Sequence, residues 1–101
     1  MNIKIEKTNE KTLFKLDGWL DTASAPELDE KISEIENTEA IILDFEKVDY
    51  ISSSGLRVVV ACHRKAKDIS ASLSIINVCT EVMNIFKLTG LDKKLDITAK
   101  N

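Results

Sequence analysis

Charged and apolar residues alternate at the start of the chain. Ile3 and Ile5 alternate with Lys4 and Glu6, and a second apolar group between Leu13 and Leu16 follows the polar residues 9–11. Alternation of this kind is typical of β-strands with one buried face, and a short polar segment between two such strands forms a turn. The pattern therefore predicts an N-terminal β-hairpin.

The next apolar positions have helical spacing. Leu28, Ile32 and Ile35 recur at i, i+4 and i+7, which places them on one stripe of a helix that faces a sheet. The residues before them include hydroxyls, acidic groups and Pro26, all of which favour a helix N-terminus. We therefore predict a first helix within residues 21–37.

A continuous apolar run follows at Ala40–Phe45. Its short length and its β-branched residues predict a central strand that is covered on both faces. From Ser54 to about Lys67 the alternation of apolar and basic residues predicts a second helix. One face of this helix is expected to carry Leu56, Val59, Val60 and His63.

Three further elements complete the pattern. Leu73–Val78 has the composition of a strand, a third helix is expected to end at Gly90, and Leu95 and Ile97 mark a short last strand. The third helix is expected to contain Val82, Ile85, Phe86 and Leu88. The resulting order, β-β-α-β-α-β-α-β, predicts a single α/β domain over residues 1–101, with a mixed β-sheet, an N-terminal hairpin and about three main helices.

Composition narrows the class of protein. The 101 residues are 44% hydrophobic and 31% charged, which is the balance of one globular domain. A net charge of -3 is unsuited to neutralising many phosphates, so nucleic acid is not an expected partner. The N-terminus lacks the apolar region of a signal peptide and no run is long enough to cross a bilayer, so we expect a cytoplasmic protein without a membrane partner. Cys62 and Cys79 are expected to be buried apolar residues, and neither a metal nor a cofactor is expected.

Three consecutive serines stand between the central strand and the second helix. They precede Gly55, in the kind of loop where ligands meet the carboxyl ends of strands in open α/β sheets. Ser52 or Ser53 is suited to cap the helix by accepting a bond from a free backbone N–H. Alternatively, the helix start receives a phosphoryl group, because its free N–H groups and its dipole favour an anion. The residues alone leave both interpretations open.

The chain resembles STAS domains, and most closely the stand-alone bacterial anti-sigma factor antagonists. Three segments carry the resemblance, in the order in which the family has them, and together they cover nearly all of the chain. They are LDGWLDTASAPEL at residues 16–28, AIILDFEKVDYISSSGLRVVV at 40–60, and IFKLTGLDKKLDI at 85–97.

The resemblance implies a regulatory mechanism. The central motif of these antagonists reads Asp-Ser-Ser/Thr-Gly-Leu, and alignment through Gly55 and Leu56 makes Ser53 the phosphoacceptor, ahead of Ser52 and Ser54. Ser52 replaces the aspartate of the motif. In the family, the unphosphorylated antagonist binds an anti-sigma factor that is also a serine kinase, and the sigma factor is released. Phosphorylation reverses this binding, and a phosphatase restores it.

The expected partner-binding surface surrounds the serines. It comprises Asp21, Ser52, Ser53, Ser54, Gly55, Leu56 and Arg57. Asp21 matches the aspartate of the family's Gly-x-Leu-Asp segment, and it is equally suited to capping the loop or the first helix. Trp19 and Tyr50 are expected near the same loop as amphipathic edges of the core rather than as recognition anchors.

Two other functions compete with partner switching. The replacement of the motif's aspartate by Ser52 favours a constitutive interaction or scaffold module without a phosphorylation switch. An enzyme is not expected, because His63 is the only histidine and lies more than two helical turns beyond Ser53, too far to activate it.

Overall fold

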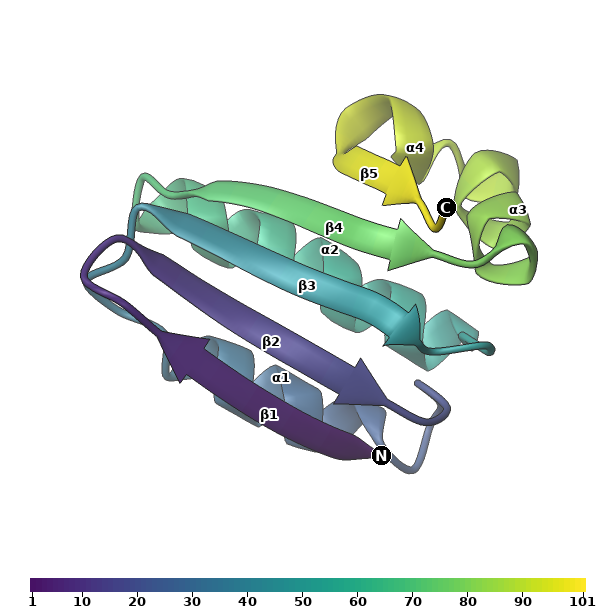
Figure 1. Cartoon of the computed structure of the whole chain (residues 1–101), viewed down its shortest axis with the longest axis horizontal. Helices are drawn as coiled ribbons and strands as arrows, with labels where there is room; N and C mark the ends of the chain where they lie inside the picture. The colour runs from purple at the N-terminus through teal and green to yellow at the C-terminus, as the bar shows by residue number, and fades with distance from the viewer.

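The structure is a five-stranded β-sheet with its helices on one face and at one end (Figure 1). The computed structural model describes all residues, 1–101. The elements are β1 Asn2–Lys7, β2 Lys11–Asp17, α1 Ala25–Ser33, β3 Ala40–Lys47, α2 Ser53–Asp68, β4 Ser72–Val78, α3 Thr80–Thr89, α4 Leu91–Lys94 and β5 Asp96–Ala99. The α/β class and the mixed sheet are confirmed, and only the short helix α4 was not expected.

The N-terminal hairpin is confirmed. β1 runs antiparallel to β2, with Ile3 opposite Leu16 and Ile5 opposite Phe14. The turn is closed by Thr8, whose backbone N–H donates to the Lys11 carbonyl at 2.9 Å. All other neighbouring strands are parallel, in the order β1-β2-β3-β4-β5.

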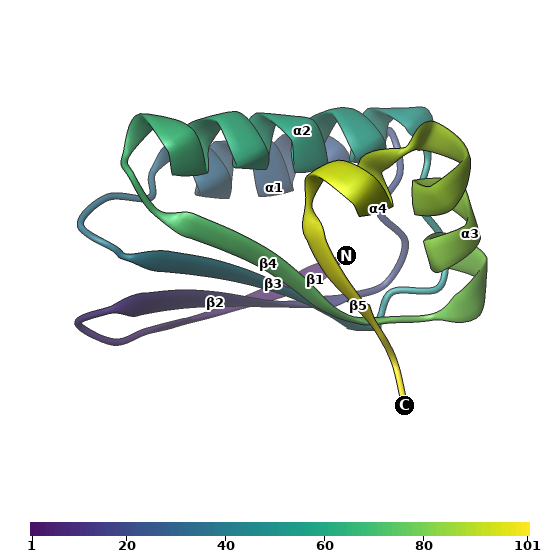
Figure 2. The same ribbon diagram turned by 90° about the horizontal axis from the view of Figure 1, so that it is seen from above.

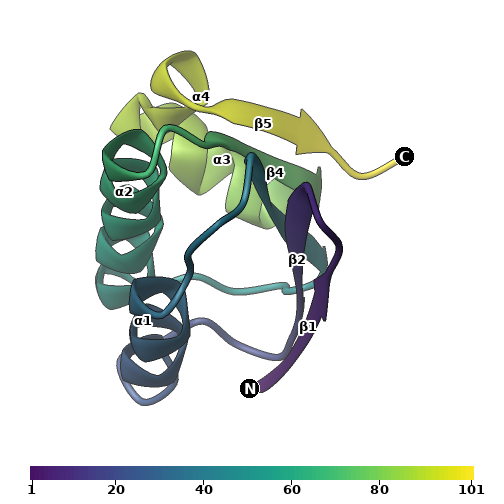
Figure 3. The same ribbon diagram turned by 90° about the vertical axis from the view of Figure 1, so that its left-hand side faces the viewer.

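Helices cover only one face of the sheet, which corrects the prediction for the central strand. α1 and α2 lie side by side on the same face (Figures 2 and 3). Accordingly Ile41, Leu43 and Phe45 of β3 are buried, whereas Ile42 and Asp44 on the other face are half-buried. The strand order explains this arrangement. Successive crossovers from β2 to β3 to β4 advance in one direction, and right-handed crossovers that advance in one direction place their helices on one side.

The buried faces of α1 and α2 match the predicted ones to different degrees. Leu28 and Ile32 are buried on α1 as expected, whereas Ile35 is buried just beyond the end of the helix at Ser33. In α2 the buried residues are Gly55, Val58, Val59, Cys62 and Ala66. The expected face of Leu56, Val59, Val60 and His63 is therefore wrong by about one residue, or roughly 100° around the helix. The run of three valines, Val58–Val60, is compatible with either rotation of the helix, because Val59 can face the core together with Val58 or with Val60.

The two cysteines differ in exposure. Cys62 is buried in the core, and this burial raises the pKa of its thiol to about 12. Cys79 is only half-buried, so the expectation of burial holds for Cys62 and not fully for Cys79. Both are free thiols.

The C-terminal helices close the end of the core. Val82 and Phe86 of α3 are buried, and the helix ends at Gly90, which adopts the left-handed conformation with φ of 78°. This end point was predicted. Leu88, by contrast, is 84% exposed and lies off the buried stripe. None of the helices combines the length and the apolar character needed to cross a membrane.

The contrast between Phe86 and Leu88 gives a test of the packing. The Phe86 ring is fully buried, with its centroid 6.0 Å from that of Phe45. We expect Phe86→Ala to lower the free energy of unfolding by about 3–5 kcal/mol, because it removes a large core side chain and leaves a cavity. Leu88→Ala, two residues along the same helix, should change it by less than about 0.5 kcal/mol. Urea denaturation followed by circular dichroism measures both, and similar losses for the two variants would contradict this placement of α3.

Candidate functional site

The candidate site lies at the carboxyl edge of the parallel strands. The loop after β2 and the loop after β3 both leave the sheet at this edge (Figure 1). A parallel bridge between Leu20 and Ile51 joins them. The Leu20 N–H donates to the Tyr50 carbonyl at 3.0 Å, and the Ser52 N–H donates to the Leu20 carbonyl at 2.9 Å. The two loops therefore form one backbone unit beneath the start of α2.

The structure gives each of the three serines a different role. Ser52 is the N-cap of α2, and its hydroxyl accepts a bond from the Gly55 N–H at 3.2 Å. The hydroxyl of Ser54 lies 3.1 Å from that of Thr22 in the neighbouring loop. Ser53 is exposed, and its hydroxyl makes no hydrogen bond within the chain. α2 begins at Ser53, one residue earlier than expected, and the cap falls to Ser52 rather than to Ser53.

Two free backbone N–H groups lie at the start of α2, next to the exposed Ser53 hydroxyl. The N–H groups of Gly55 and Leu56 both donate to Ser52, through its side chain and its carbonyl. The N–H groups of Ser53 and Ser54 have no acceptor in the chain. Together with the positive end of the dipole of a 16-residue helix, these two donors favour an anion beside Ser53.

Gly55 is required by a close approach of two main chains. A Cβ at this position would lie 2.7 Å from the Leu20 carbonyl oxygen and 2.8 Å from a side-chain carbon of Ile51. Contacts this short cannot form without displacing backbone. Gly55 is itself buried, so its contribution to the site is to let α2 start directly against the Leu20–Ile51 bridge.

Asp21 closes a turn within its own loop. Its Oδ1 accepts bonds from the N–H groups of Ala23 and Ser24, each at 3.0 Å, and lies 3.2 Å from the Ser24 hydroxyl oxygen. The hydrogen bond from the Ser24 backbone is the main reason that the pKa of this carboxyl lies below its ordinary value. Asp21 thus takes the loop-capping role that sequence reasoning left open. The residue of this loop that contacts the serines is Thr22, which the sequence pattern did not single out.

Leu56 and Arg57 extend the site along the outer side of α2. Leu56 is half-buried and Arg57 is exposed. Both line a shallow hollow of about 470 Å³ that continues toward the end of α3, and its other lining residues are Val60, Arg64, Thr89 and Leu91. Of the seven residues expected at the partner surface, Ser53 and Arg57 are the most open to solvent.

Two aromatic residues at this edge are more exposed than predicted. Trp19 is 61% exposed and Tyr50 is 48% exposed, and their ring centroids lie 5.5 Å apart. They were expected to be edges of the core, but Leu20 and Ile51, one residue further along each chain segment, occupy the buried positions instead. His63 lies about 15 Å along the helix from Ser53 and does not contact the serines.

The sequence model of the STAS domain family matches residues 2–100 of the chain. The chain belongs to the STAS domain family. It is 33% identical to the anti-sigma-B factor antagonist of Bacillus subtilis (strain 168) over 104 aligned residues, which cover 100% of this chain and 95% of that protein. The resemblance inferred from the three sequence segments is confirmed at the level of the family.

Solved structures show the same fold. An anti-sigma factor antagonist from Mycobacterium paratuberculosis superposes with a TM-score of 0.85 at 21% identity, covering 96% of this chain and 84% of the other. The Bacillus cell fate determinant SpoIIAA in the phosphorylated form superposes with a TM-score of 0.75 at 23% identity, covering 95% of this chain and 90% of the other. The likeness in fold therefore extends over nearly all of this chain.

Substitution of Gly55 tests the close approach at the base of the site. We expect Gly55→Ala to lower the free energy of unfolding by about 1–3 kcal/mol, because the added methyl group meets backbone atoms that cannot move freely. A higher free energy of unfolding would contradict the close approach, since alanine favours a helix over glycine by about 1 kcal/mol where there is room for its methyl group. Ser54→Ala is the matched control and should cost less than about 1 kcal/mol. Chemical denaturation of both variants decides between these outcomes.

The turn at Asp21 predicts a specific pH dependence. Its carboxyl should titrate below its ordinary value of 3.8, because the charged form accepts hydrogen bonds from the backbone N–H groups of Ser24 and Ala23. A carboxyl whose pKa is lowered by folding stabilises the fold above its ordinary pKa, and this stabilisation is lost as the pH falls through the lowered value. Carboxyl-carbon NMR of the folded protein measures the titration. A midpoint at or above 3.8 would show that the turn does not hold the carboxylate.

Proposed function

We propose that this protein is an anti-sigma factor antagonist that acts by partner switching. In its unphosphorylated form it binds an anti-sigma factor that is also a serine kinase, and the sigma factor is freed. Phosphorylation of the serine loop reverses the binding, and a phosphatase restores it. The support is the family membership together with the 33% identity, across the whole chain, to a protein named anti-sigma-B factor antagonist. The protein would act in the cytoplasm, by binding rather than by catalysis.

The exposure of Ser53 is the observation that carries the switch. A kinase needs an accessible hydroxyl that is not committed to the fold. Ser52 caps α2 and Ser54 is bonded to Thr22, whereas Ser53 is exposed and unbonded. Modification of Ser53 therefore removes no contact that holds the loop. Ser53 is also the acceptor position given by alignment through Gly55 and Leu56.

A phosphate on Ser53 would act through its charge. It would add about -1.5 to -2 charges at neutral pH, next to the free N–H groups of Ser53 and Ser54. Exposed charges act strongly over about 8 Å at physiological salt, a range that includes Arg57 one helical turn further on. A partner surface fitted to the neutral loop would meet repulsion or an unpaired charge, so its affinity would fall.

The replacement of the motif's aspartate by Ser52 is compatible with this switch. Serine and aspartate are similarly good N-caps, and Ser52 does cap α2. The local helix start is therefore kept. What changes is the charge beside Ser53, because serine contributes no negative charge to the surface that a kinase recognises.

That loss of charge also favours the second candidate function. If the kinase requires an acidic group before its acceptor, Ser52 leaves Ser53 unmodified. The protein would then be a constitutive STAS interaction module, bound to its regulatory complex through the same loop and the exposed side of α2.

Phosphorylation by a purified kinase tests the proposal. The protein is incubated with ATP and the anti-sigma factor kinase of the same organism, and site-resolved mass spectrometry locates the phosphate. We expect one phosphate, on Ser53. Ser53→Ala should bind the anti-sigma factor as the unmodified protein does. It should stay bound in the presence of ATP, because it cannot be phosphorylated. Ser53→Asp should weaken binding at least tenfold, since about 1.4 kcal/mol of repulsion or desolvation suffices for that change.

Ser54→Ala is the matched control for these variants. It removes a neighbouring hydroxyl but leaves Ser53 in place, so it should still be phosphorylated and released. Phosphate on Ser52 or Ser54 alone would refute Ser53 as the acceptor. A stable complex without any phosphorylation would favour the constitutive module, and the absence of any complex would refute both.

A further inference from the structure

Trp19 and Tyr50 form an exposed aromatic pair next to the serine loop. Their rings are tilted by 51° with centroids 5.5 Å apart, and they are 61% and 48% exposed. Complete burial of an aromatic side chain removes about 150–250 Å² of surface from water, and a partner that covers this pair would remove the exposed part of that area, about half or more for each ring. Aromatic residues of this kind dominate the binding energy of protein interfaces. Neither ring is needed by the core of this protein.

The backbone beneath the pair is held firmly. Each ring comes just before a buried residue, Trp19 before Leu20 and Tyr50 before Ile51, and these two residues form the bridge between the loops. The Trp19 carbonyl also accepts a bond from the Ser24 hydroxyl at 2.7 Å. The two segments that carry the rings would therefore lose little conformational entropy when a partner covers the pair.

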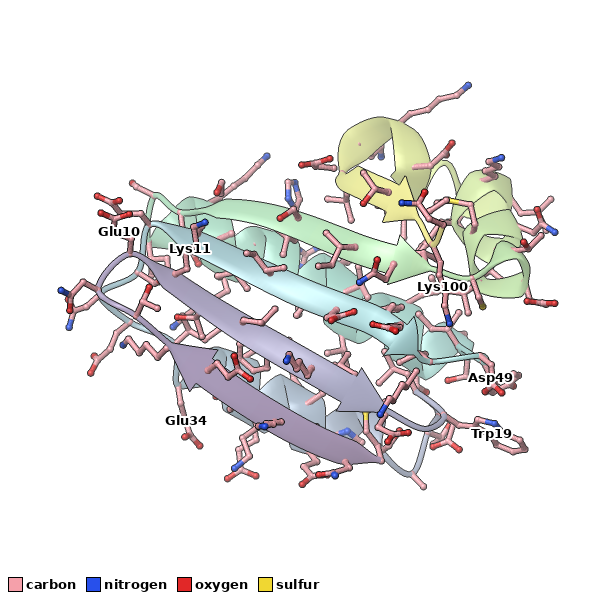
Figure 4. All side chains as sticks on the ribbon, in the orientation of Figure 1. Glu10, Lys11, Trp19, Glu34, Asp49 and Lys100 are labelled. Carbon is pink, nitrogen blue, oxygen red and sulfur yellow. The ribbon has the colours of Figure 1, made fainter.

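The pair lies beside the proposed switch. The Ser52 N–H donates to the Leu20 carbonyl, so the segment that carries Trp19 runs directly against the start of α2. Figure 4 shows Trp19 and Asp49 projecting from the same end of the molecule, opposite the end that carries Glu10 and Lys11. A protein bound over Ser53 can reach both rings.

The charges around the pair indicate what kind of group fits it. Asp21 and Glu27 line a hollow of about 260 Å³ together with Trp19, and Asp49 is exposed beside Tyr50. None of these carboxylates has an ion-pair partner, since the only ion pairs of the chain join Glu6 to Lys4 and Lys15. The ammonium group of Met1, which lines the same hollow, offsets one of the three charges.

We propose that the Trp19–Tyr50 pair receives an arginine or lysine side chain of the anti-sigma factor. A cation over an aromatic face, with tryptophan the best of the three aromatic residues, is attracted by the ring electrons, and the surrounding carboxylates add to this attraction. The inference rests on the proposed function for the identity of the partner. It adds the chemistry that the partner presents and a contact outside the serine loop.

The chain has only one tryptophan, so the indole of Trp19 reports on this site alone. The indole N–H signal is followed by NMR during titration with a tetra-arginine peptide, and with a tetra-glutamate peptide as the control. We expect a saturable shift with tetra-arginine only. Tyr50→Ala, which keeps the reporter and every charge, should reduce the shift, and so should Asp49→Asn. Equal shifts with both peptides, or none with either, would overturn the cationic assignment.

Binding to the purified anti-sigma factor kinase tests the contact in the complex. Trp19→Ala and Tyr50→Ala should each weaken binding at least tenfold by calorimetry. Ile5→Ala is the matched control, because Ile5 is 43% exposed but lies in the middle of β1, and it should change affinity by less than twofold.

The outcomes separate this inference from the proposed function. If the unmodified protein binds the kinase and both aromatic variants bind equally well, the inference is wrong and the proposed function stands. If no complex forms with the unmodified protein, the proposed function is wrong and so is the partner named here. Loss of binding in the aromatic variants but not in Ile5→Ala supports both.

Discussion

The close approach of α2 to the Leu20 backbone is the constraint on which the site depends. Gly55 allows the first turn of the helix to lie against the Leu20 carbonyl, and that same carbonyl accepts the bond from Ser52. Two loops from different strands are thereby fixed as one unit. The contact between Thr22 and Ser54 requires this distance between the loops. A larger residue at position 55 would separate them.

The order of the strands decides where such a site can form. Because β2, β3 and β4 follow one another without reversal, their crossovers place α1 and α2 on one face, and no crevice opens between helices on opposite faces. The loops are instead gathered along one edge of the sheet, at the surface. An edge of this kind suits contact with another protein better than enclosure of a small substrate.

Much of the fold follows from the sequence because it depends on periodicity. The alternation at Ile3 and Ile5, the stripe from Leu28 to Ile35 and the stop at Gly90 are local signals, and the structure contains the element that each predicted. The face of α2 was misjudged because three adjacent valines leave the rotation of the helix open. The rotation is set by the packing of Gly55 against Leu20 and of Cys62 and Ala66 in the core. β3 was expected to be covered by helices on both faces, but helices cover only one. An apolar run does not reveal the order of the strands, and this order decides on which face the helices lie.

The site itself was predictable in position but not in detail, for the same physical reason. Three hydroxyls in a row are chemically alike in the sequence, and they become different only through contacts with Thr22 and with the helix N–H groups. The exposure of Trp19 likewise depends on which of two adjacent apolar residues takes the bridge position, and Leu20 takes it.

This division of roles bears on how a phosphate at Ser53 would be read by a partner. The hydrogen bonds that hold the two loops belong to Ser52, Ser54, Thr22 and the Leu20 backbone, and none of them involves the Ser53 side chain. Added charge at Ser53 therefore breaks none of the hydrogen bonds that hold the two loops together. The free N–H groups beside it stabilise the charge where it is formed. The fold thus favours an electrostatic switch, in which the charge at Ser53 changes while the hydrogen bonds that hold the two loops stay the same.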